Sequence, residues 1–173
     1  MEHAHTIYLS LGGNLGDRAA SIARAVEALT AAGLKITRQS SLYETAPVPP
    51  AKSSQRMYLN CCLEAETALM PRQLLRVVRE IERSLGRRRA PGSEGQPRTI
   101  DIDILLYGTS RVQMRDLELP HPRMAERRFV LVPLSEIAPA LRHPTLNKTV
   151  AELLAELRDP GRVVRYKGLS TPA

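Results

Sequence analysis

Alternating apolar and polar side chains mark residues 98–107 as a strand. Because strand side chains alternate between the two faces of a sheet, the aliphatic and polar residues of this segment are expected on opposite faces. The core face is predicted to carry Ile100, Ile102, Ile104 and Leu106, and the opposite face Thr99, Asp101 and Asp103. The dense apolar run further predicts a central place in the sheet for this strand.

The two carboxylates of this strand need a physical reason, because aspartate is depleted in strands. Their Cα atoms would lie roughly 6.5 Å apart, so the two like charges repel each other unless cations lie between them. A pair of hard divalent ions, as in phosphoryl transfer, is one arrangement that bridged carboxylates serve. The pattern alone also fits an edge strand whose acids meet arginine or lysine on a neighbouring strand.

The chain before this strand carries three further strand patterns and two helix patterns. The strands are predicted at residues 6–11, 34–43 and 58–66. A helix capped by Asp17 is predicted to stop near Gly33, and an amphipathic helix is predicted over residues 71–85. The glycine-rich turn at 12–16 lacks both GxGxxG and the Lys-Ser/Thr of a Walker loop, which counts against a P-loop.

Proline-rich segments interrupt these patterns. The prolines of residues 44–50 cannot continue a strand ladder, so a stiff loop that can present groups to a ligand is expected there. His121 has a proline on each side, which holds it in an extended or turn conformation. Residues 87–97 form a basic loop, rich in Gly and Pro, that leads directly into the strand with the two aspartates.

The remaining patterns are an apolar segment at 130–134, a helix at about 150–157 and an edge strand at 163–166. The order βαββαβ predicts an α+β fold, a ferredoxin-like α/β sandwich with a mixed, mainly antiparallel sheet and helices packed on it. We expect the helices to cover one sheet face and to leave the other free for ligand. The length of 173 residues predicts a single domain, residues 1–173.

Charge and aromatic content narrow the ligand class. The formal net charge of +7, from 25 basic and 18 acidic residues, predicts attraction to polyanions. Aromatic residues make up 3% of the chain, so stacking platforms for single-stranded nucleic acid are scarce. A small phosphorylated ligand is therefore favoured.

Cysteine usage and the missing signal patterns bear on location. Cys61 and Cys62 would face opposite sides of a strand, which argues against a disulfide framework and for a reducing compartment. The N-terminus has no signal-peptide pattern, and no apolar run approaches the roughly 20 residues that a membrane helix requires. These features predict a soluble protein of the cytoplasm.

Charged side chains from several segments suit a polyphosphate. They are the two aspartates, the loop arginines with Arg98, His121 and Arg127, beside the polar strand around Asn60. A nucleoside triphosphate with about four negative charges, together with two aspartates, is roughly neutralised by two divalent ions and several arginines.

Several motifs, in this order along the chain, point to one family. They are Leu-Gly-Gly-Asn-Leu-Gly-Asp-Arg at 11–18, Tyr-Glu-Thr-Ala-Pro at 43–47, Tyr-Leu-Asn at 58–60, Glu-Arg-Ser-Leu-Gly-Arg at 82–87, Pro-Arg-Thr-Ile-Asp-Ile-Asp at 97–103, Pro-His-Pro-Arg-Met at 120–124 and Arg-Arg-Phe at 127–129. In these motifs the chain resembles, nearly from end to end, the 6-hydroxymethyl-7,8-dihydropterin pyrophosphokinases of folate biosynthesis.

The resemblance implies an enzyme that transfers the terminal diphosphate of ATP to the hydroxymethyl group of the reduced pterin and releases AMP. It implies that Asp101 and Asp103 bridge two Mg²⁺ ions and that Arg87 and Arg98 neutralise charge on the transferring group. The other ATP contacts that it implies are Glu82, Arg89, Ile104, His121 and Arg127. The pterin contacts that it implies are Thr45, Pro47, Val48, Tyr58, Asn60 and a stacking Phe129.

Loop 87–97 is implied to be a lid that closes on both substrates and excludes water. Relatives often place an aromatic residue just before the Pro-Arg-Thr motif, where this chain has Gly95-Gln96, and some place one at Pro122. The partners implied are the small molecules ATP and hydroxymethyl dihydropterin, with no nucleic acid, no membrane and no obligatory protein partner.

Two other functions are compatible with the charge and the fold pattern. A basic ferredoxin-like RNA-binding module would place aromatics on its central strands and carry RNP-type signatures, which this sequence lacks. Another two-metal phosphotransferase, or a nuclease, would explain the two aspartates but would leave Phe129, Asn60 and the proline loop without a role.

Overall fold

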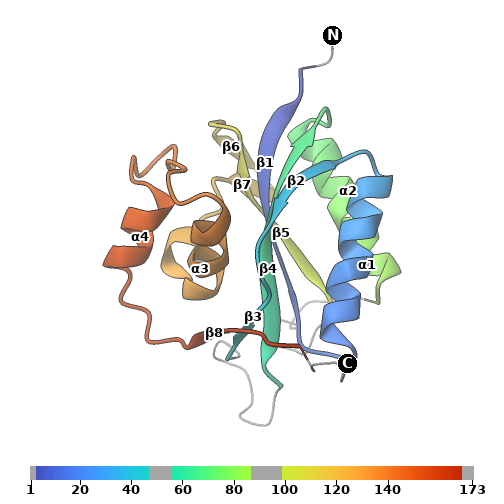
Figure 1. Ribbon diagram of the computed structural model, residues 1–173. Coiled ribbons are helices and arrows are strands. Elements are labelled where there is room, and N and C mark those ends of the chain that lie inside the picture. Colours follow the sequence, from blue (N-terminus) through green and yellow to red (C-terminus); the bar gives the residue numbers. More distant parts are fainter. Residues whose placement is uncertain (1–2, 47–55, 87–98, 169–173) are drawn as a thin grey trace.

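The computed structural model describes residues 3–46, 56–86 and 99–168 of the chain (Figure 1). In chain order its elements are β1 (His5–Gly13), α1 (Arg18–Ala31), β2 (Lys35–Gln39), β3 (Tyr43–Thr45), β4 (Tyr58–Thr67), α2 (Pro71–Ser84), β5 (Asp101–Tyr107), β6 (Val112–Met114), β7 (Leu117–Leu119), η1 (Met124–Glu126), α3 (Arg128–Ile137), α4 (Val150–Glu156) and β8 (Val163–Arg165). A six-stranded sheet forms the centre, with α1 and α2 on one face and α3 and α4 on the other (Figure 1). The predicted α+β sandwich is confirmed.

Local signals start and end the first two helices as predicted. Asp17 accepts a hydrogen bond from the backbone N–H of Ala20 at 3.1 Å and so caps the N-terminus of α1. Just beyond that helix, Gly33 has a φ of +98°, a left-handed conformation that favours glycine. Pro71 occupies the first position of α2, where a missing N–H leaves no helical hydrogen bond unmade.

The strands follow the order β5-β1-β4-β3-β8, and β2 pairs with another part of β4. Every pairing between strands in the described ranges is antiparallel. Residues 34–43, predicted as one strand, form β2 and the first residue of β3, because the chain leaves the sheet between them. The predicted C-terminal edge strand is confirmed as β8, which pairs with β3.

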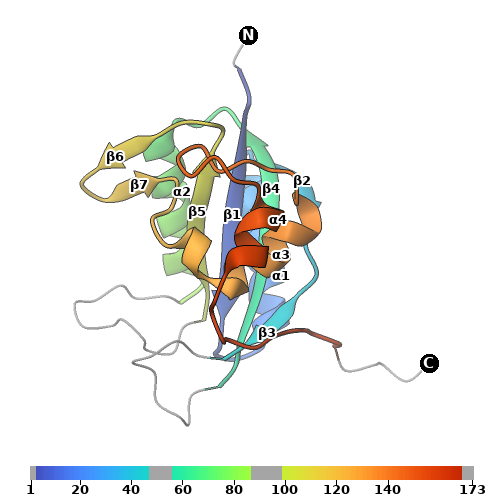
Figure 2. The same cartoon turned by 90° about the vertical axis from the view of Figure 1, so that its left-hand side faces the viewer.

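The strand with the two aspartates, β5, lies at the edge of the sheet, so the predicted central position is wrong. Within the described sheet it pairs only with β1. Its apolar residues are nevertheless buried, because helices cover both faces and the β6–β7 hairpin lies beside it (Figure 2). A dense apolar run thus reports burial of both faces and does not distinguish a central strand from a covered edge.

A β-bulge changes which face Leu106 occupies. Tyr8 pairs with Leu106 and Leu9 pairs with Ile104, which leaves Leu105 as the extra residue. Beyond the bulge, Leu106 packs beside Leu105 against α3 and α4, whereas the isoleucines pack against α1 and α2 as predicted. The prediction that Leu106 shares the face of the isoleucines is therefore wrong.

The second sheet face is partly covered, contrary to the prediction that it stays free for ligand. The apolar segment 130–134 forms the middle of α3, and its side chains pack on Cys62 and Leu105. At the other end of β5 the same face carries Asp101 and Asp103, which are half-buried. Helix packing thus confines any ligand on this face to the end where β5 begins.

Candidate active site

Two rows of residues cross the sheet where β1 ends and β5 begins. In the first row, Asn60 of β4 is in register with Gly12 of β1, which is in register with Asp101 of β5. In the second row, Ser10 lies between Cys62 and Asp103 in the same way. Residues in register on antiparallel strands project to the same face. The structure therefore brings Asn60 and both aspartates onto one face, as the sequence predicted for the aspartates.

Gly12 allows the amide of Asn60 to lie across β1. A Cβ atom at Gly12 would lie 2.1 Å from Oδ1 of Asn60, which is closer than real Cβ contacts come. The Nδ2 group of Asn60 donates to Oγ1 of Thr45 at 2.6 Å, and both side chains are buried. Sequence reasoning missed Gly12, although a glycine inside a strand is a known signal of close approach by another group.

Glu82 holds the backbone of β5 between the two aspartates. Its side chain is 1% exposed, and its Oε2 accepts a hydrogen bond from the N–H of Ile102 at 3.0 Å. This contact comes from the α1 and α2 side of the sheet and helps to fix the spacing of Asp101 and Asp103. Ile104 is also buried on that side, in the core. Whether Glu82 and Ile104 contact ATP stays a prediction.

His121 lies against the outer edge of β5, because its N–H donates to the carbonyl of Leu105 at 2.9 Å. Its Nδ1 accepts a hydrogen bond from the N–H of Arg123 at 3.1 Å. Burial lowers the pKa of the imidazole; the negative charge of Asp103 opposes this shift, and Arg127 adds to it. The ring is therefore neutral at physiological pH and carries its proton on Nε2, which makes that nitrogen a hydrogen-bond donor.

Arg127 and Phe129 flank the start of α3. The guanidinium carbon of Arg127 lies 5.4 Å from the ring centre of Phe129, within the range of a cation–π contact. Phe129 is half-buried and packs at the margin of the cluster below α3 and α4. Arg127, His121 and Asp103 are close enough to interact electrostatically, so the structure brings these three predicted site residues together.

The other predicted site residues are only partly described. Tyr58 is half-buried at the start of β4, in register with Thr45. The remaining ones lie outside the described residues: Pro47, Val48, Arg87, Arg89 and Arg98.

The glycine-rich turn after β1 contacts the start of β4. Nδ2 of Asn14 donates to the carbonyl of Arg56 at 3.2 Å. Arg18 donates to the carbonyl of Met57 at 3.0 Å and pairs with Glu44 at 2.7 Å. Sequence reasoning weighed this turn only as a phosphate loop and missed that Arg18 ties it to β3 and β4, the strands that carry Thr45 and Asn60.

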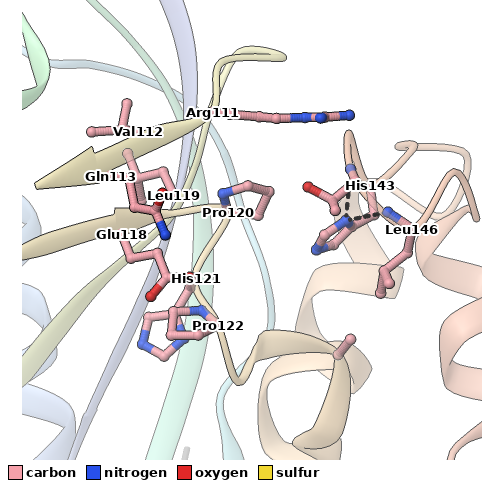
Figure 3. Close-up of a pocket in the computed structure, with 12 residues that line it drawn as sticks. Arg111, Val112, Gln113, Glu118, Leu119, Pro120, His121, Pro122, His143 and Leu146 are labelled. Carbon is pink, nitrogen blue, oxygen red and sulfur yellow. Dashed lines mark hydrogen bonds between the residues drawn. The ribbon is translucent and has the colours of Figure 1, made fainter.

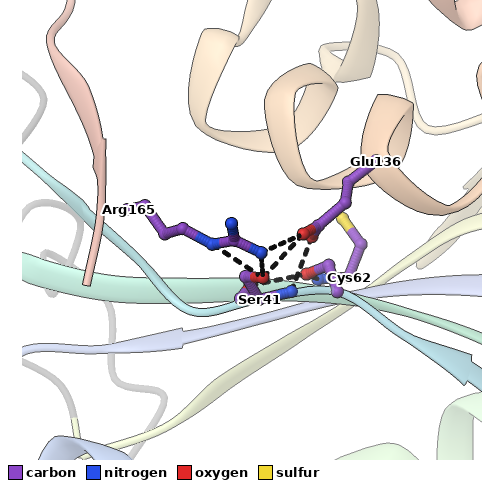
Figure 4. Close-up of polar contacts among 5 residues, drawn as sticks. Ser41, Cys62, Glu136 and Arg165 are labelled. Carbon is purple, nitrogen blue, oxygen red and sulfur yellow. Dashed lines mark hydrogen bonds and ion pairs between the residues drawn. The ribbon is translucent and has the colours of Figure 1, made fainter. Parts of the chain in front are cut away.

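A polar cluster fixes β3 from its other side (Figure 4). The carboxylate of Glu136, on α3, accepts hydrogen bonds from the N–H and the hydroxyl of Ser41, each at 2.6 Å. Arg165 of β8 pairs with the same carboxylate at 3.0 Å and also donates to the hydroxyl of Ser41. This cluster joins α3 and β8 to the residues just before β3, and so positions Thr45.

The donor set suits magnesium bound together with a phosphorylated substrate. In the described ranges, no group of three or more His, Cys, Asp or Glu side chains forms a self-sufficient metal site. Mg²⁺ is typically held by one or two carboxylates while substrate phosphates and waters complete its octahedron. Asp101 and Asp103, half-buried on one face, fit that arrangement.

Solved structures share this fold. The wild-type HPPK-DHPS protein of Plasmodium falciparum, crystallised with pteroate, superposes with a TM-score of 0.72 over 90% of this chain and 42% of that chain. At 18% sequence identity, this likeness shows the fold only. No helix among the described residues is long and apolar enough to cross a membrane.

Two sequence relatives carry the same name, and a third is a longer folic acid synthesis protein. A 2-amino-4-hydroxy-6-hydroxymethyldihydropteridine pyrophosphokinase of Methylorubrum extorquens is 44% identical over 92% of this chain and 98% of its own length. The Bacillus subtilis enzyme of that name is 44% identical over 75% of this chain and 76% of its own length. The folic acid synthesis protein fol1 of Pneumocystis carinii is 37% identical over 88% of this chain, which spans only 20% of that longer protein.

These comparisons do not support an RNA-binding module or a nuclease. The family model for 7,8-dihydro-6-hydroxymethylpterin-pyrophosphokinase matches residues 8–139, which include every described residue of the candidate site. The chain therefore belongs to the 7,8-dihydro-6-hydroxymethylpterin-pyrophosphokinase family and is an enzyme of folate biosynthesis.

Proposed function

We propose that this enzyme transfers the terminal diphosphate of ATP to the hydroxymethyl group of 6-hydroxymethyl-7,8-dihydropterin and releases AMP. The observation that carries the proposal is the shared sheet face, where the amide of Asn60, for the pterin, is in register with Asp101 across β1, and Asp103 lies in the next row. The identity of the proposed substrates is taken from the family to which the chain belongs. The face brings the two reactants together, which lowers the entropic cost of the transfer.

The pterin end of this face is built from β3, β4 and the start of α3. Asn60, fixed by its bond to Thr45, hydrogen-bonds the ring edge of the pterin. Phe129 stacks on the flat ring, and its contact with Arg127 limits the motion of both side chains. Tyr58, Pro47 and Val48 complete the slot in this proposal.

The phosphate end is built from β5, the His121 segment and the residue before α3. The Nε2–H of neutral His121 and the guanidinium of Arg127 donate to phosphate oxygens, while Arg87, Arg89 and Arg98 neutralise further charge. In the same proposal, Glu82 and Ile104 line the nucleotide pocket. Attack falls on the β-phosphorus, and AMP is the leaving group.

Asp101 and Asp103 hold two Mg²⁺ ions in this proposal. When bound, the ions screen the negative charge of the triphosphate and stabilise the charge that develops during transfer. The carboxylates also orient the phosphates with respect to the pterin slot, because β1 fixes their distance from Asn60. Glu82 contributes by holding the strand between them.

We also propose that the chain works as one cytoplasmic domain on small-molecule substrates, without an obligatory protein partner. The described helices pack on both faces of the six-stranded sheet, and the β6–β7 hairpin contributes Leu117 and Leu119 to one of the two core clusters, which supports a single folding unit. Cys61 and Cys62 are free and buried, which suits a reducing compartment.

The products of a single incubation test the reaction. The protein, with magnesium, ATP and 6-hydroxymethyl-7,8-dihydropterin, is expected to release AMP and the pterin diphosphate in equal amounts. Chromatography of the nucleotides identifies the product. Release of ADP, or of AMP without the pterin, would rule out diphosphate transfer to this substrate.

Replacing Phe129 by leucine is expected to raise KM for the pterin by about tenfold and to leave KM for ATP near its original value. An aromatic stacking contact is worth about 1 kcal/mol beyond the area that it buries, and leucine keeps part of that area. The control is Leu154→Ala, which loses packing on the same core cluster away from the sheet face. Equal changes in KM for the pterin in both variants would mean that Phe129 acts through packing only.

A further inference from the structure

The start of α3 carries two residues of the candidate site, and its own N-cap residue cannot cap it. Arg127 occupies the N-cap position, and Phe129 is the second residue of the helix. The first N–H groups of a helix need acceptors from outside its ladder of hydrogen bonds. An arginine side chain offers N–H donors and no acceptor. A side-chain cap for α3 must therefore come from another part of the chain.

Asp159, in the segment after α4, supplies this acceptor. Its Oδ2 accepts a hydrogen bond from the N–H of Arg128, the first residue of α3, at 3.1 Å. Its Oδ1 accepts the N–H of Gly161 at 2.7 Å, which fixes the carboxylate in its own turn. The residue is half-buried, and its negative charge lies at the positive end of the α3 dipole. Asp159 thus caps a helix that begins far earlier in the chain.

Arg128 binds the same segment with its side chain. Its Nε donates to the carbonyl of Asp159 at 3.1 Å, and its Nη2 donates to the carbonyl of Leu157 at 3.4 Å. The chain then continues into β8, where Arg165 pairs with Glu136 near the C-terminal end of α3 at 3.0 Å (Figure 4). The segment after α4 and the strand that follows it therefore hold α3 at both ends.

His121, on the phosphate side of the candidate site, is held by other contacts. Its N–H donates to the carbonyl of Leu105 on β5. Figure 3 shows His121 next to Pro120, where the chain leaves the β6–β7 hairpin. The hydrogen bonds from the segment after α4 therefore act on the start of α3 and not on His121.

We propose that Asp159 is a positioning residue, which caps α3 at Arg128 and so fixes Phe129 for the pterin and Arg127 for the phosphates. The inference rests on the proposed function, which assigns these ligands to the two side chains. Because the three residues of α3 are consecutive, a shift of the backbone at Arg128 moves both of its neighbours. The match of the family model ends at residue 139, so it assigns no role to Asp159.

Replacing Asp159 by alanine is expected to raise KM for the pterin by about fivefold, because the first turn of α3 frays and Phe129 loses its fixed position. Asp159→Asn keeps an oxygen that can accept the N–H of Arg128, so its KM should stay close to the original value. In a Phe129→Leu background, Asp159→Ala should raise KM by less than about twofold, since the side chain through which it acts is already gone. Steady-state AMP release at varied pterin concentration measures these effects.

The matched control is Thr149→Ala, which removes the side-chain cap of α4. The hydroxyl of Thr149 accepts the N–H of Glu152 at 3.1 Å. Loss of a cap is expected to lower Tm by about 2–4 °C in both alanine variants. KM for the pterin should rise only in Asp159→Ala. Hydrogen exchange of the Arg128 amide, which should be faster in Asp159→Ala and unchanged in Thr149→Ala, tests the cap without any substrate.

The outcomes distinguish failure of this inference from failure of the proposed function. A wild-type protein that releases no AMP in the presence of the pterin contradicts the proposed function, and the role of Asp159 with it. An active wild-type enzyme with equal KM values in Asp159→Ala and Thr149→Ala overturns the positioning role alone. The same conclusion follows if exchange of the Arg128 amide is unchanged in Asp159→Ala, or if the full increase in KM persists in the Phe129→Leu background.

Discussion

Replacing Asp103 by alanine lowers the turnover number by about a thousand-fold or more and leaves the fold intact. In our proposal this carboxylate holds magnesium against the transferring diphosphate, so its contribution is greatest in the transition state. The side chain is half-buried at the surface end of β5 and outside both core clusters. Steady-state AMP release measures the effect, and thermal unfolding shows whether the fold is kept.

The direction of the change in thermal stability of the Asp103→Ala variant can also be predicted. Asp101 and Asp103 carry like charges on one sheet face, so removing one of them relieves repulsion and leaves Tm equal or higher in the absence of metal. The control is Asp116→Ala, which removes an exposed carboxylate paired with Arg79 at 3.2 Å. Such surface pairs contribute little, so this control keeps both its activity and its Tm. Near-normal activity of Asp103→Ala would place the metal site elsewhere.

Replacing Gly12 by alanine is expected to have the second-largest effect, on pterin binding and on stability together. The added Cβ meets Oδ1 of Asn60 at 2.1 Å and the carbonyl of Leu59 at 3.3 Å. Because the backbone of β4 cannot yield easily, the Asn60 side chain must rotate and lose its bond to Thr45. We expect the free energy of unfolding to fall by about 1–3 kcal/mol and KM for the pterin to rise by about tenfold or more.

Denaturant unfolding and substrate titration measure these two effects separately. KM for ATP should change less than KM for the pterin, because the three atoms nearest to the added Cβ belong to Asn60 and Leu59 and not to Asp101. The control is Gly168→Ala, an exposed position where a new Cβ meets only an ordinary contact at 3.8 Å. A Gly12→Ala variant with the stability and kinetics of this control would mean that Asn60 can move without loss.

Local physical chemistry made much of the fold predictable. The cap of α1 depends on Asp17 and its own N-terminal turn, and α2 depends on Pro71 and a stripe of apolar residues. Both features are properties of one short segment, so the sequence contains them in full. The same holds for the two aspartates, whose common face follows from the period of a strand.

Features that depend on distant parts of the chain were not predictable in this way. The edge position of β5 is a property of the strand order, and the side on which Leu106 lies results from the bulge opposite Tyr8 and Leu9. The role of Arg18 depends on where the start of β4 lies. The proton position on His121 depends on the N–H of Arg123, a contact that only the folded segment creates.

Cys61 and Cys62 offer a way to follow how the two helical layers separate from the sheet. Cys61 is buried toward α1 and α2, and Cys62 toward α3 and α4. Burial raises the pKa of the Cys61 thiol to about 12 and that of Cys62 well above its usual range, so neither forms the reactive thiolate in the native state. The relative alkylation rates of these two neighbours therefore report which layer opens first during unfolding.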